Sequence, residues 1–327
     1  MLYPFLFHPI FKERVWGGRR LAELYQKPLP PGTPIGECWE VSDRPGDVSV
    51  IANGPLAGRD LRWLMENHAA DLLGAASPQA GRFPLLVKVL DAREKLSLQV
   101  HPPAQVAAVL GGEPKTEMWY IADATPGAEL YAGLRRGVSR RQFEEKIQAG
   151  SVAECFHRLS VRPGDAMFLP SGRVHAIGAG LIIFEIQQNS DTTYRVFDWN
   201  RLGLDGQARP LHIRQSLASI NFDDFEPSLA PREWQSQVSS DCRSRILAND
   251  PLFKVELFEA KLPQSLPLNN NGFKIVALLE GRLAATQGST SLHLQRGQFC
   301  LIPAACQPCQ LAIEDSCSFL LVQPGAP

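Results

Sequence analysis

The sequence predicts a mainly β protein that contains two related barrels, with a few helices inserted in its N-terminal part. Short apolar runs rich in β-branched and aromatic residues recur along the chain, each bounded by Gly or Pro. A repeat indicates two barrels, because residues 162–170 and 296–303 both contain a glycine, an apolar run and a proline six residues after the glycine. A glycine turn followed by a strand and a proline exit is typical of a barrel edge.

The individual elements follow from local signals. Strands are expected in the apolar runs at 84–90, 96–100, 119–121, 166–169, 181–186 and 273–279. Four helices are expected from capping residues and periodicity: between Asp60 and Gly74, between a Ser139/Gln142 capping box and Gly150, over 152–158 with a Ser151/Glu154 box, and over 213–220. The Pro-rich, polar stretch over 226–237 is a plausible connection between the barrels.

Bulk properties restrict the classes of partner. The net charge of −1 leaves no broad basic face for nucleic acid or an anionic membrane, so an anionic ligand would have to be held by a few placed cations. No apolar run is long enough to span a bilayer. The apolar residues 1–11 lack a basic segment and contain Pro4 and Pro9, which favours a buried strand or ordered arm over a signal peptide. The sequence does not indicate an oligomeric state.

The cysteines indicate a reducing compartment. Seven is an odd number, and their scattered spacing fits a reduced, cytoplasmic protein better than a disulfide framework. Cys306 and Cys309 form a CxxC pair with Cys300 and Cys317 nearby, so a zinc or redox site is conceivable. Because no histidine joins them at finger-like spacing, buried strand cysteines are the favoured interpretation.

A metal site is the first chemical signal. Gln99 and His101 lie two residues apart on an expected strand and therefore face the same side. Glu117 opens another expected strand, and His175 follows the first copy of the repeat. Two imidazoles, a carboxylate and an amide oxygen suit Zn²⁺ or a similar divalent ion. The ligands would contribute one negative charge, that of the carboxylate, and the ion two positive charges. The site would therefore stay positive and favour Lewis-acid chemistry on oxygen.

Six segments together resemble a known family. In chain order they read VWGG at 15–18, GECW at 36–39, FPLLVK at 83–88, QVHP at 99–102, KTE at 115–117 and QQNSDTTYRV at 187–196. In this combination they resemble the short bacterial class of mannose-6-phosphate isomerases, whose length the chain also matches. One departure is the sequence Pro102-Pro103-Ala104, where the family commonly has acidic residues, and it puts local loop contacts in doubt.

The resemblance implies a fold and a metal. It implies a cupin-type (jelly-roll) β-barrel with a helical insertion and a second such barrel, which we place at residues 1–235 and 236–327. It implies one zinc ion per chain, held by Gln99, His101, Glu117 and His175, with Gln99 the ligand that some members replace. In the second copy of the repeat, the residue five positions after the proline is Pro308 instead of a histidine, so the C-terminal barrel is expected to be metal-free.

The resemblance also implies an activity, the interconversion of D-mannose 6-phosphate and D-fructose 6-phosphate, for which we expect a cis-enediol intermediate. It places Arg195 in the active centre, Arg201 where a phosphate-binding cation is expected, and Ser97 and Trp16 in the pocket lining. Arginine suits phosphate, although either arginine could instead pair with a carboxylate such as Asp198.

The proton-transfer groups remain open. Glu185 and Lys115 are the candidate acid–base residues, with a slight preference for Glu185 because a lysine base needs a depressed pKa. Either residue could equally belong to a structural ion pair.

Two other functions fit part of the same pattern. Two histidines and one carboxylate can bind Fe²⁺ in a mononuclear oxygenase, although many such enzymes have His-x-Asp where this chain has Gln99-x-His101. A sugar-phosphate-binding regulator without catalysis would keep the arginines and could lose the metal ligands. All four candidate ligands are present, which favours the isomerase.

Overall fold

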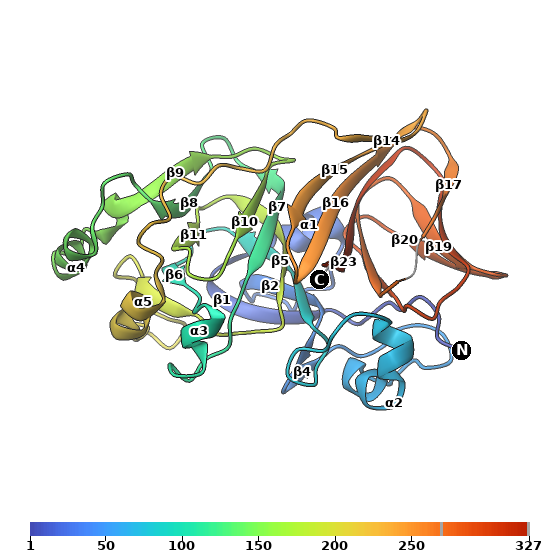
Figure 1. The fold of residues 1–327 in the computed structure, drawn as a ribbon, viewed down its shortest axis with the longest axis horizontal. Coiled ribbons are helices and arrows are strands. Elements are labelled where there is room, and N and C mark those ends of the chain that lie inside the picture. The colour runs from blue at the N-terminus through green and yellow to red at the C-terminus, as the bar shows by residue number, and fades with distance from the viewer. Residues whose placement is uncertain (269–270, 326–327) are drawn as a thin grey trace.

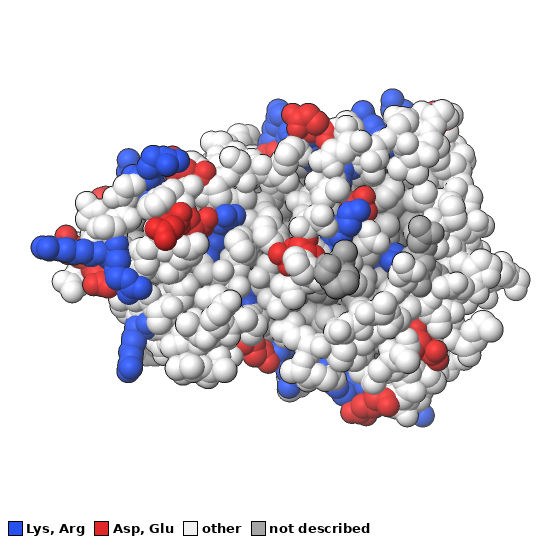
Figure 2. All heavy atoms as spheres, viewed as in Figure 1, with Lys and Arg blue, Asp and Glu red and all other residues white. Residues whose placement is uncertain are grey.

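The computed structural model describes residues 1–268 and 271–325. The described part is mainly β, and its strands form two barrels that lie side by side (Figure 1), which confirms the predicted fold class. Each barrel combines a six-stranded sheet with a smaller sheet. Within these residues, no helix is both long enough and apolar enough to cross a bilayer. On the face shown in Figure 2, Lys and Arg lie interspersed with Asp and Glu among uncharged residues.

Barrel one comprises the N-terminal strands. In sheet order its six-stranded sheet is β1 (Ile10–Gly18), β2 (Ile35–Val41), β5 (Leu85–Ala92), β12 (Leu181–Gln188), β7 (Glu117–Ala124) and β10 (Ala166–Leu169). Its five-stranded sheet is β13 (Tyr194–Phe197), β6 (Leu98–Val100), β11 (His175–Ile177), β8 (Glu129–Leu134) and β9 (Phe156–Ser160). A separate small hairpin pairs β3 (Asp43–Arg44) with β4 (Asp47–Val48).

Barrel two comprises the C-terminal strands. Its six-stranded sheet is β14 (Ser236–Ser239), β15 (Cys242–Asn249), β16 (Phe253–Ala260), β23 (Cys317–Pro324), β18 (Lys274–Glu280) and β21 (Phe299–Ile302). Its four-stranded sheet is β17 (Gln264–Pro267), β22 (Cys309–Ile313), β19 (Leu283–Gln287) and β20 (Thr290–Leu294). The Pro-rich stretch over 226–237 leads from barrel one into β14.

The two barrels share one topology. The eight strands from β5 to β12 occupy the same places in their sheets as the eight from β16 to β23, which is the eight-stranded pattern of a jelly roll. The repeat lies at equivalent places, because β10 and β21 each form the end of a six-stranded sheet. Gly164 and Gly297 precede these strands with φ of +88° and +77°, a left-handed conformation that favours glycine.

A shared apolar core joins the barrels. Along β12, Phe184 and Ile186 point to this core while Ile183 and Glu185 point into barrel one, as strand alternation requires. From barrel two, β16, β18, β21 and β23 contribute side chains such as Val255 to the same core. The six-stranded sheets therefore pack against each other through their outer faces, and each barrel keeps an interior of its own.

The N-terminal arm is ordered and buried, as expected. The backbone N–H of Phe5 donates to the carbonyl of Leu301 at 2.8 Å, and the N–H of Leu301 donates back at 2.9 Å. The Phe5 ring is fully buried in the shared core. The first residues of the chain thus add to the edge of barrel two at β21.

The predicted helices form, with one correction. Those confirmed are α2 (Leu61–Leu73), α4 (Arg140–Gln148) and α5 (Ile213–Ser219). Asp60 caps α2 by accepting the N–H of Trp63 at 2.7 Å, and α4 has the predicted capping box. The box at Ser151 is wrong, because its side chain makes no cap hydrogen bond and Glu154 pairs with Lys146 instead. The helix predicted over 152–158 is also too long, because only the short 3-10 helix η1 (Val152–Cys155) forms and residues 156–158 begin β9. Two further short helices, α1 (Arg20–Tyr25) and α3 (Ala104–Ala107), were not predicted.

Candidate active site

Three strands of barrel one bring the predicted metal ligands together. Glu117 is the first residue of β7, and His175 is the first residue of β11. Gln99 on β6 is the direct cross-strand partner of His175, and His101 follows the end of β6. Ligands far apart in the sequence therefore converge because the strands carrying them start or end at the same place in the barrel.

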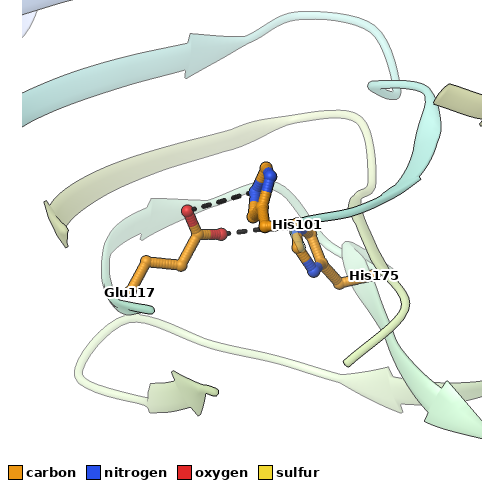
Figure 3. A group of neighbouring side chains, drawn as sticks. All are labelled: His101, Glu117 and His175. Carbon is orange, nitrogen blue, oxygen red and sulfur yellow. Dashed lines mark ion pairs between the residues drawn. The ribbon is translucent and has the colours of Figure 1, made fainter. Parts of the chain in front are cut away.

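His101, Glu117 and His175 form a compact, buried group (Figure 3). One carboxylate oxygen of Glu117 lies 3.3 Å from Nε2 of His175, and the other lies 3.5 Å from Nε2 of His101. One ligand atom from each of the three residues lies within 4.8 Å of the others. Among the described residues, this is the one group of histidine, cysteine or acidic side chains close enough to hold a metal ion.

The backbone orients both imidazoles toward the centre of the group. Nδ1 of His101 donates to the carbonyl of Thr192 at 2.8 Å, and Nδ1 of His175 donates to the carbonyl of Arg173 at 2.9 Å. With the proton on Nδ1, each Nε2 keeps its lone pair for a ligand. Burial, assisted by the charge of Lys115, lowers the pKa of His101 to about 4, and burial also lowers the pKa of His175. Both imidazoles are therefore neutral near pH 7, the form that binds metals.

Glu117 is held as a carboxylate. Its burial favours the protonated acid, but the Lys115 ammonium at 3.1 Å outweighs burial and holds the pKa of Glu117 well below its usual value. The same contact works in reverse on Lys115. Burial tends to lower the pKa of Lys115, but the charges of Glu117 and Glu185 raise it by a larger amount, so Lys115 keeps its proton.

The group fits a divalent cation. Nε2 of His101 and both carboxylate oxygens of Glu117 are buried and make no hydrogen bond of good geometry with the described residues, although Oε2 is ion-paired with Lys115. Nε2 of His101 and Oε1 of Glu117 therefore cost stability unless another partner binds them. Two neutral imidazoles and one carboxylate are a donor set typical of zinc. The Gln99 amide lies 3.3 Å from Nε2 of His175, so turning the amide would present its oxygen to the same centre.

A pocket of about 610 Å³ opens next to this group. Part of its wall is formed by Gln99, which contacts His175, and by Lys115, which contacts Glu117. The sequence-predicted residues that line the pocket are Trp16, Ser97, Gln99, Lys115, Glu185 and Arg195. The structure therefore brings these six candidates together beside the three buried ligands.

Arg201 is the predicted substrate-binding residue that does not line this pocket. Its Nε and Nη2 donate to Asp198 at 3.0 and 2.9 Å, and its Nη1 donates to the carbonyl of Lys95. This is the carboxylate pairing that the sequence left open as the alternative for Arg201. Arg209, which was not predicted, shares Asp198 with Arg201 and does line the pocket.

A chain of alternating charges crosses the pocket wall, and sequence reasoning missed most of it. The Lys88 ammonium lies 3.6 Å from Glu37 and 3.3 Å from Glu185. Glu37 also accepts from Arg14 at 2.7 Å. Burial opposes ionisation of Glu37, but Lys88 and Arg14 prevail and lower its pKa to about 2. A signal existed, since Lys88 is a lone cation in the apolar run of β5.

The cysteines are core residues. All seven are buried, and five of them pack in the interior of barrel two: Cys242, Cys300, Cys306, Cys309 and Cys317. Burial raises the pKa of the Cys300 thiol well above its usual value, which keeps it protonated. The interpretation as buried core cysteines is therefore the one that fits.

Comparisons with known proteins identify the family. Residues 5–125 match the family model of the phosphomannose isomerase type I catalytic domain. The chain is 35% identical to the mannose-6-phosphate isomerase ManA of Bacillus subtilis, over 92% of this chain and 93% of the relative. It is 34% identical to a mannose-6-phosphate isomerase of Streptococcus mutans, over 93% of both chains. The crystal structure of a Bacillus subtilis mannose 6-phosphate isomerase, 29% identical, superposes with a TM-score of 0.89 and covers 98% of this chain and 100% of that one. From its site, its fold and these full-length relatives, the chain belongs to the mannose-6-phosphate isomerase family.

Proposed function

We propose that this enzyme interconverts D-mannose 6-phosphate and D-fructose 6-phosphate through a cis-enediol intermediate, with one zinc ion per chain. The observation that carries the proposal is the group of His101, Glu117 and His175, whose inward-facing ligand atoms lie beside a pocket lined by Glu185 and Arg195. Membership of an isomerase family supports the same reaction.

The metal would be held by His101, Glu117 and His175, with the Gln99 oxygen as a fourth ligand. When bound, a divalent cation supplies Lewis-acid stabilisation to negative charge on the sugar oxygens. The ligand carboxylate is already ionised and both imidazoles are already neutral, so binding needs no proton to leave these side chains near pH 7.

Glu185 is the proposed base. The two sugars differ by a hydrogen that leaves C2 and arrives at C1, with protons redistributed on O1 and O2. Indole Nε1 of Trp119 donates to one Glu185 oxygen at 2.9 Å, and Lys88 lies 3.3 Å from the other, so the carboxylate is held in the pocket wall. It removes the C2 proton and returns a proton at C1. A positioned acid–base group of this kind contributes about 10²–10⁴ in rate.

Lys115 and Arg195 are the proposed charge-stabilising groups. Lys115 keeps its proton, because it is paired with Glu117 at 3.1 Å and lies near Glu185. It therefore serves as a proton donor or fixed positive charge instead of a base. Arg195 lines the pocket and has a buried Nε without a partner among the described residues, so it can donate toward oxygen where negative charge develops.

Barrel two is proposed to be metal-free and structural, with the division between the barrels at residues 235 and 236. Lys274 occupies the strand position in barrel two that Glu117 occupies in barrel one, and a cation there opposes metal binding. The role of barrel two would be to cover the outer face of the catalytic barrel through the shared core.

A coupled assay for fructose 6-phosphate, with and without a chelator, tests the activity. We expect production of fructose 6-phosphate that is lost in chelator and restored by zinc. Binding of mannose 6-phosphate without turnover would point instead to a sugar-phosphate-binding regulator. Full activity in demonstrably metal-free protein would exclude a role for the metal.

Isotope exchange tests the intermediate. In deuterated water, deuterium should appear at C1 of fructose 6-phosphate and, on reversal, at C2 of mannose 6-phosphate. Both early and late samples are needed, because a shielded proton exchanges slowly. Complete retention of the original hydrogen after many turnovers would contradict the cis-enediol and indicate hydride transfer.

A further inference from the structure

The loop after β13 forms a small hairpin that places two arginines on one wall of the pocket. Leu202 pairs with Ala208, and the N–H of Gly203 donates to the carbonyl of Gln207 at 2.6 Å. The hairpin ends at Arg209. The next carbonyl, that of Pro210, accepts Nη1 of Arg195 at 2.8 Å.

The segment after the hairpin runs back along β13. The N–H of His212 donates to the carbonyl of Arg195 at 2.8 Å, and the N–H of Arg195 donates to Nδ1 of His212 at 3.1 Å. Arg195 and Arg209 are therefore fixed as neighbours, and both line the pocket. The pKa of Arg195 is lowered, first by burial and then by repulsion from Arg209, which is a further sign of their closeness.

Asp198 accepts hydrogen bonds from two arginines, which differ in how many of their guanidinium nitrogens have partners. All three guanidinium nitrogens of Arg201 are engaged, two by Asp198 and one by the carbonyl of Lys95. Arg209 contacts the same carboxylate in a fork, with Nε at 2.7 Å and Nη2 at 2.6 Å. Within the described residues, no hydrogen bond engages Nη1 of Arg209. Arg209 therefore keeps one whole terminal nitrogen for a ligand at the pocket wall, whereas every nitrogen of Arg201 already has a partner and Arg201 does not line the pocket.

This end of the pocket presents two guanidiniums, from Arg195 and Arg209, and one lining carboxylate, that of Asp205. One oxygen of Asp205 already accepts the N–H of Gln207 at 3.0 Å. Behind this wall, Asp198 pairs with both Arg201 and Arg209, and the charge of Glu94 also acts on Arg201. Donors from two adjacent guanidiniums, Nε of Arg195 and Nη1 of Arg209, suit a phosphate dianion better than a neutral hydroxyl.

We propose that Arg209, next to Arg195, is the residue that contacts the phosphate of the sugar substrate, and that Arg201 lies behind it against Asp198. This rests on the proposed function, since it names the group that recognises the phosphate in the same pocket. Arg209 thereby becomes a specificity-determining residue, selecting phosphorylated over neutral sugars.

The test compares three arginine-to-glutamine variants of the zinc-loaded enzyme. Arg209→Gln and Arg201→Gln each remove one guanidinium from the same carboxylate, so their difference isolates the pocket contact. Arg62→Gln removes a similar fork, from Asp43, that lies outside this pocket. The readouts are KM and kcat for mannose 6-phosphate, competitive inhibition by inorganic phosphate, and Tm.

Arg209→Gln should raise KM, and the inhibition constant of inorganic phosphate, by about ten- to a hundredfold with a much smaller change in kcat. Arg209→Lys should lie between it and the wild type, because the charge remains without the fork. The KM change in Arg201→Gln should be far smaller, and Arg62→Gln should affect Tm alone.

Equal KM effects in Arg209→Gln and Arg201→Gln, or a larger effect in Arg201→Gln, would overturn the inference. So would unchanged inhibition by inorganic phosphate in Arg209→Gln. If the wild type does not isomerise mannose 6-phosphate, the proposed function fails separately. Calorimetric binding of inorganic phosphate to the same variants would still decide the role of Arg209.

Discussion

Barrels one and two have the same strand order but opposite charges at one equivalent position. Glu117 begins β7 and pairs with Leu169, the residue before the proline of the first repeat copy. Lys274 begins β18 and pairs with Ile302, the residue before the proline of the second copy. Both side chains are buried, at 0% and 6% exposure. One barrel thus places a carboxylate where the other places an amine.

The surroundings of the two residues differ as well. Glu117 has the Lys115 ammonium at 3.1 Å, which compensates its charge, and two neutral imidazoles within 3.5 Å. The Lys274 ammonium donates a long hydrogen bond to the carbonyl of Gly272 at 3.4 Å, and burial lowers the pKa of Lys274. The comparison teaches that the jelly-roll frame does not by itself bring potential metal ligands together. A few residues at strand ends do so in barrel one, and the same frame accommodates a lysine at the equivalent position of barrel two.

The largest effect is expected from removing a metal ligand in barrel one. His175→Ala should abolish metal retention and reduce kcat/KM by more than the roughly 10–100-fold that typically follows loss of an outer-shell partner. Circular dichroism should stay native, because the strands do not depend on the imidazole. Metal content per chain is the measurement.

Lys274→Met in barrel two serves as the matched control and should retain one metal per chain. If His175→Ala still binds one metal per chain, the site is not in barrel one, and the contrast between the barrels fails.

The second effect concerns proton transfer. Glu185→Gln should reduce kcat by about 10²–10⁴ with the metal content unchanged, because the amide cannot accept the C2 proton. Glu256→Gln on β16 of barrel two, which removes a carboxylate paired with Lys254, should keep the wild-type kcat. A near-normal kcat in Glu185→Gln would assign the base to another residue.

The third effect is on stability. Burial alone would raise the pKa of Glu37 above its ordinary value of 4.5. The charges of Lys88 and Arg14 outweigh burial and lower this pKa to about 2. A carboxylate whose pKa is lower in the folded state than in the unfolded chain stabilises the fold fully at pH values above its pKa in the unfolded chain. This contribution is lost as the pH falls through its pKa in the folded state. A pKa difference of this size corresponds to roughly 3 kcal/mol at neutral pH.

Glu37→Gln should therefore lower the free energy of unfolding at pH 7 by a similar amount. It should also flatten the loss of stability between pH 4.5 and 2 that the wild type shows. Urea titrations at several pH values measure both quantities. An unchanged pH profile in the variant would mean that other carboxylates dominate acid unfolding.

The smallest effect is expected in the interior of barrel two. Lys274→Met should raise the free energy of unfolding by about 1 kcal/mol, because an apolar side chain replaces a buried, poorly paired ammonium. In barrel one, Lys88→Met should instead be destabilising, since it leaves Glu37 and Glu185 without their shared cation. If Lys274→Met instead lowers the free energy of unfolding, the interactions of the Lys274 ammonium stabilise the fold by more than its desolvation destabilises it.

Most of the fold was predictable, for a physical reason. Apolar runs bounded by Gly and Pro report strands directly, and the capping residues at Asp60 and Ser139 report helix starts. The helices α1 and α3 were missed because neither begins with a side-chain cap and both are short. Ser151 and Glu154 have the capping-box spacing without the hydrogen bonds, because Glu154 finds Lys146 outside its own segment. Spacing alone cannot reveal such a competitor.

The site was predictable where its residues share a strand or a known motif. Gln99 and His101 stand two apart, and the remaining predicted residues came from segments that resemble the family. Arg209 lay outside every such signal. Its place in the pocket depends on how a hairpin folds back along β13, and sequence alone could not separate it from Arg201.

The pairing of Phe5 with Leu301 has a consequence for biosynthesis. A strand contact across almost the whole chain cannot form on the ribosome until nearly all of the protein has been made. Until then, the apolar arm and the outer face of β12 and β5 have no barrel two to pack against. The nascent catalytic half therefore exposes aggregation-prone surface during synthesis, and chaperone demand should peak before the last strands emerge.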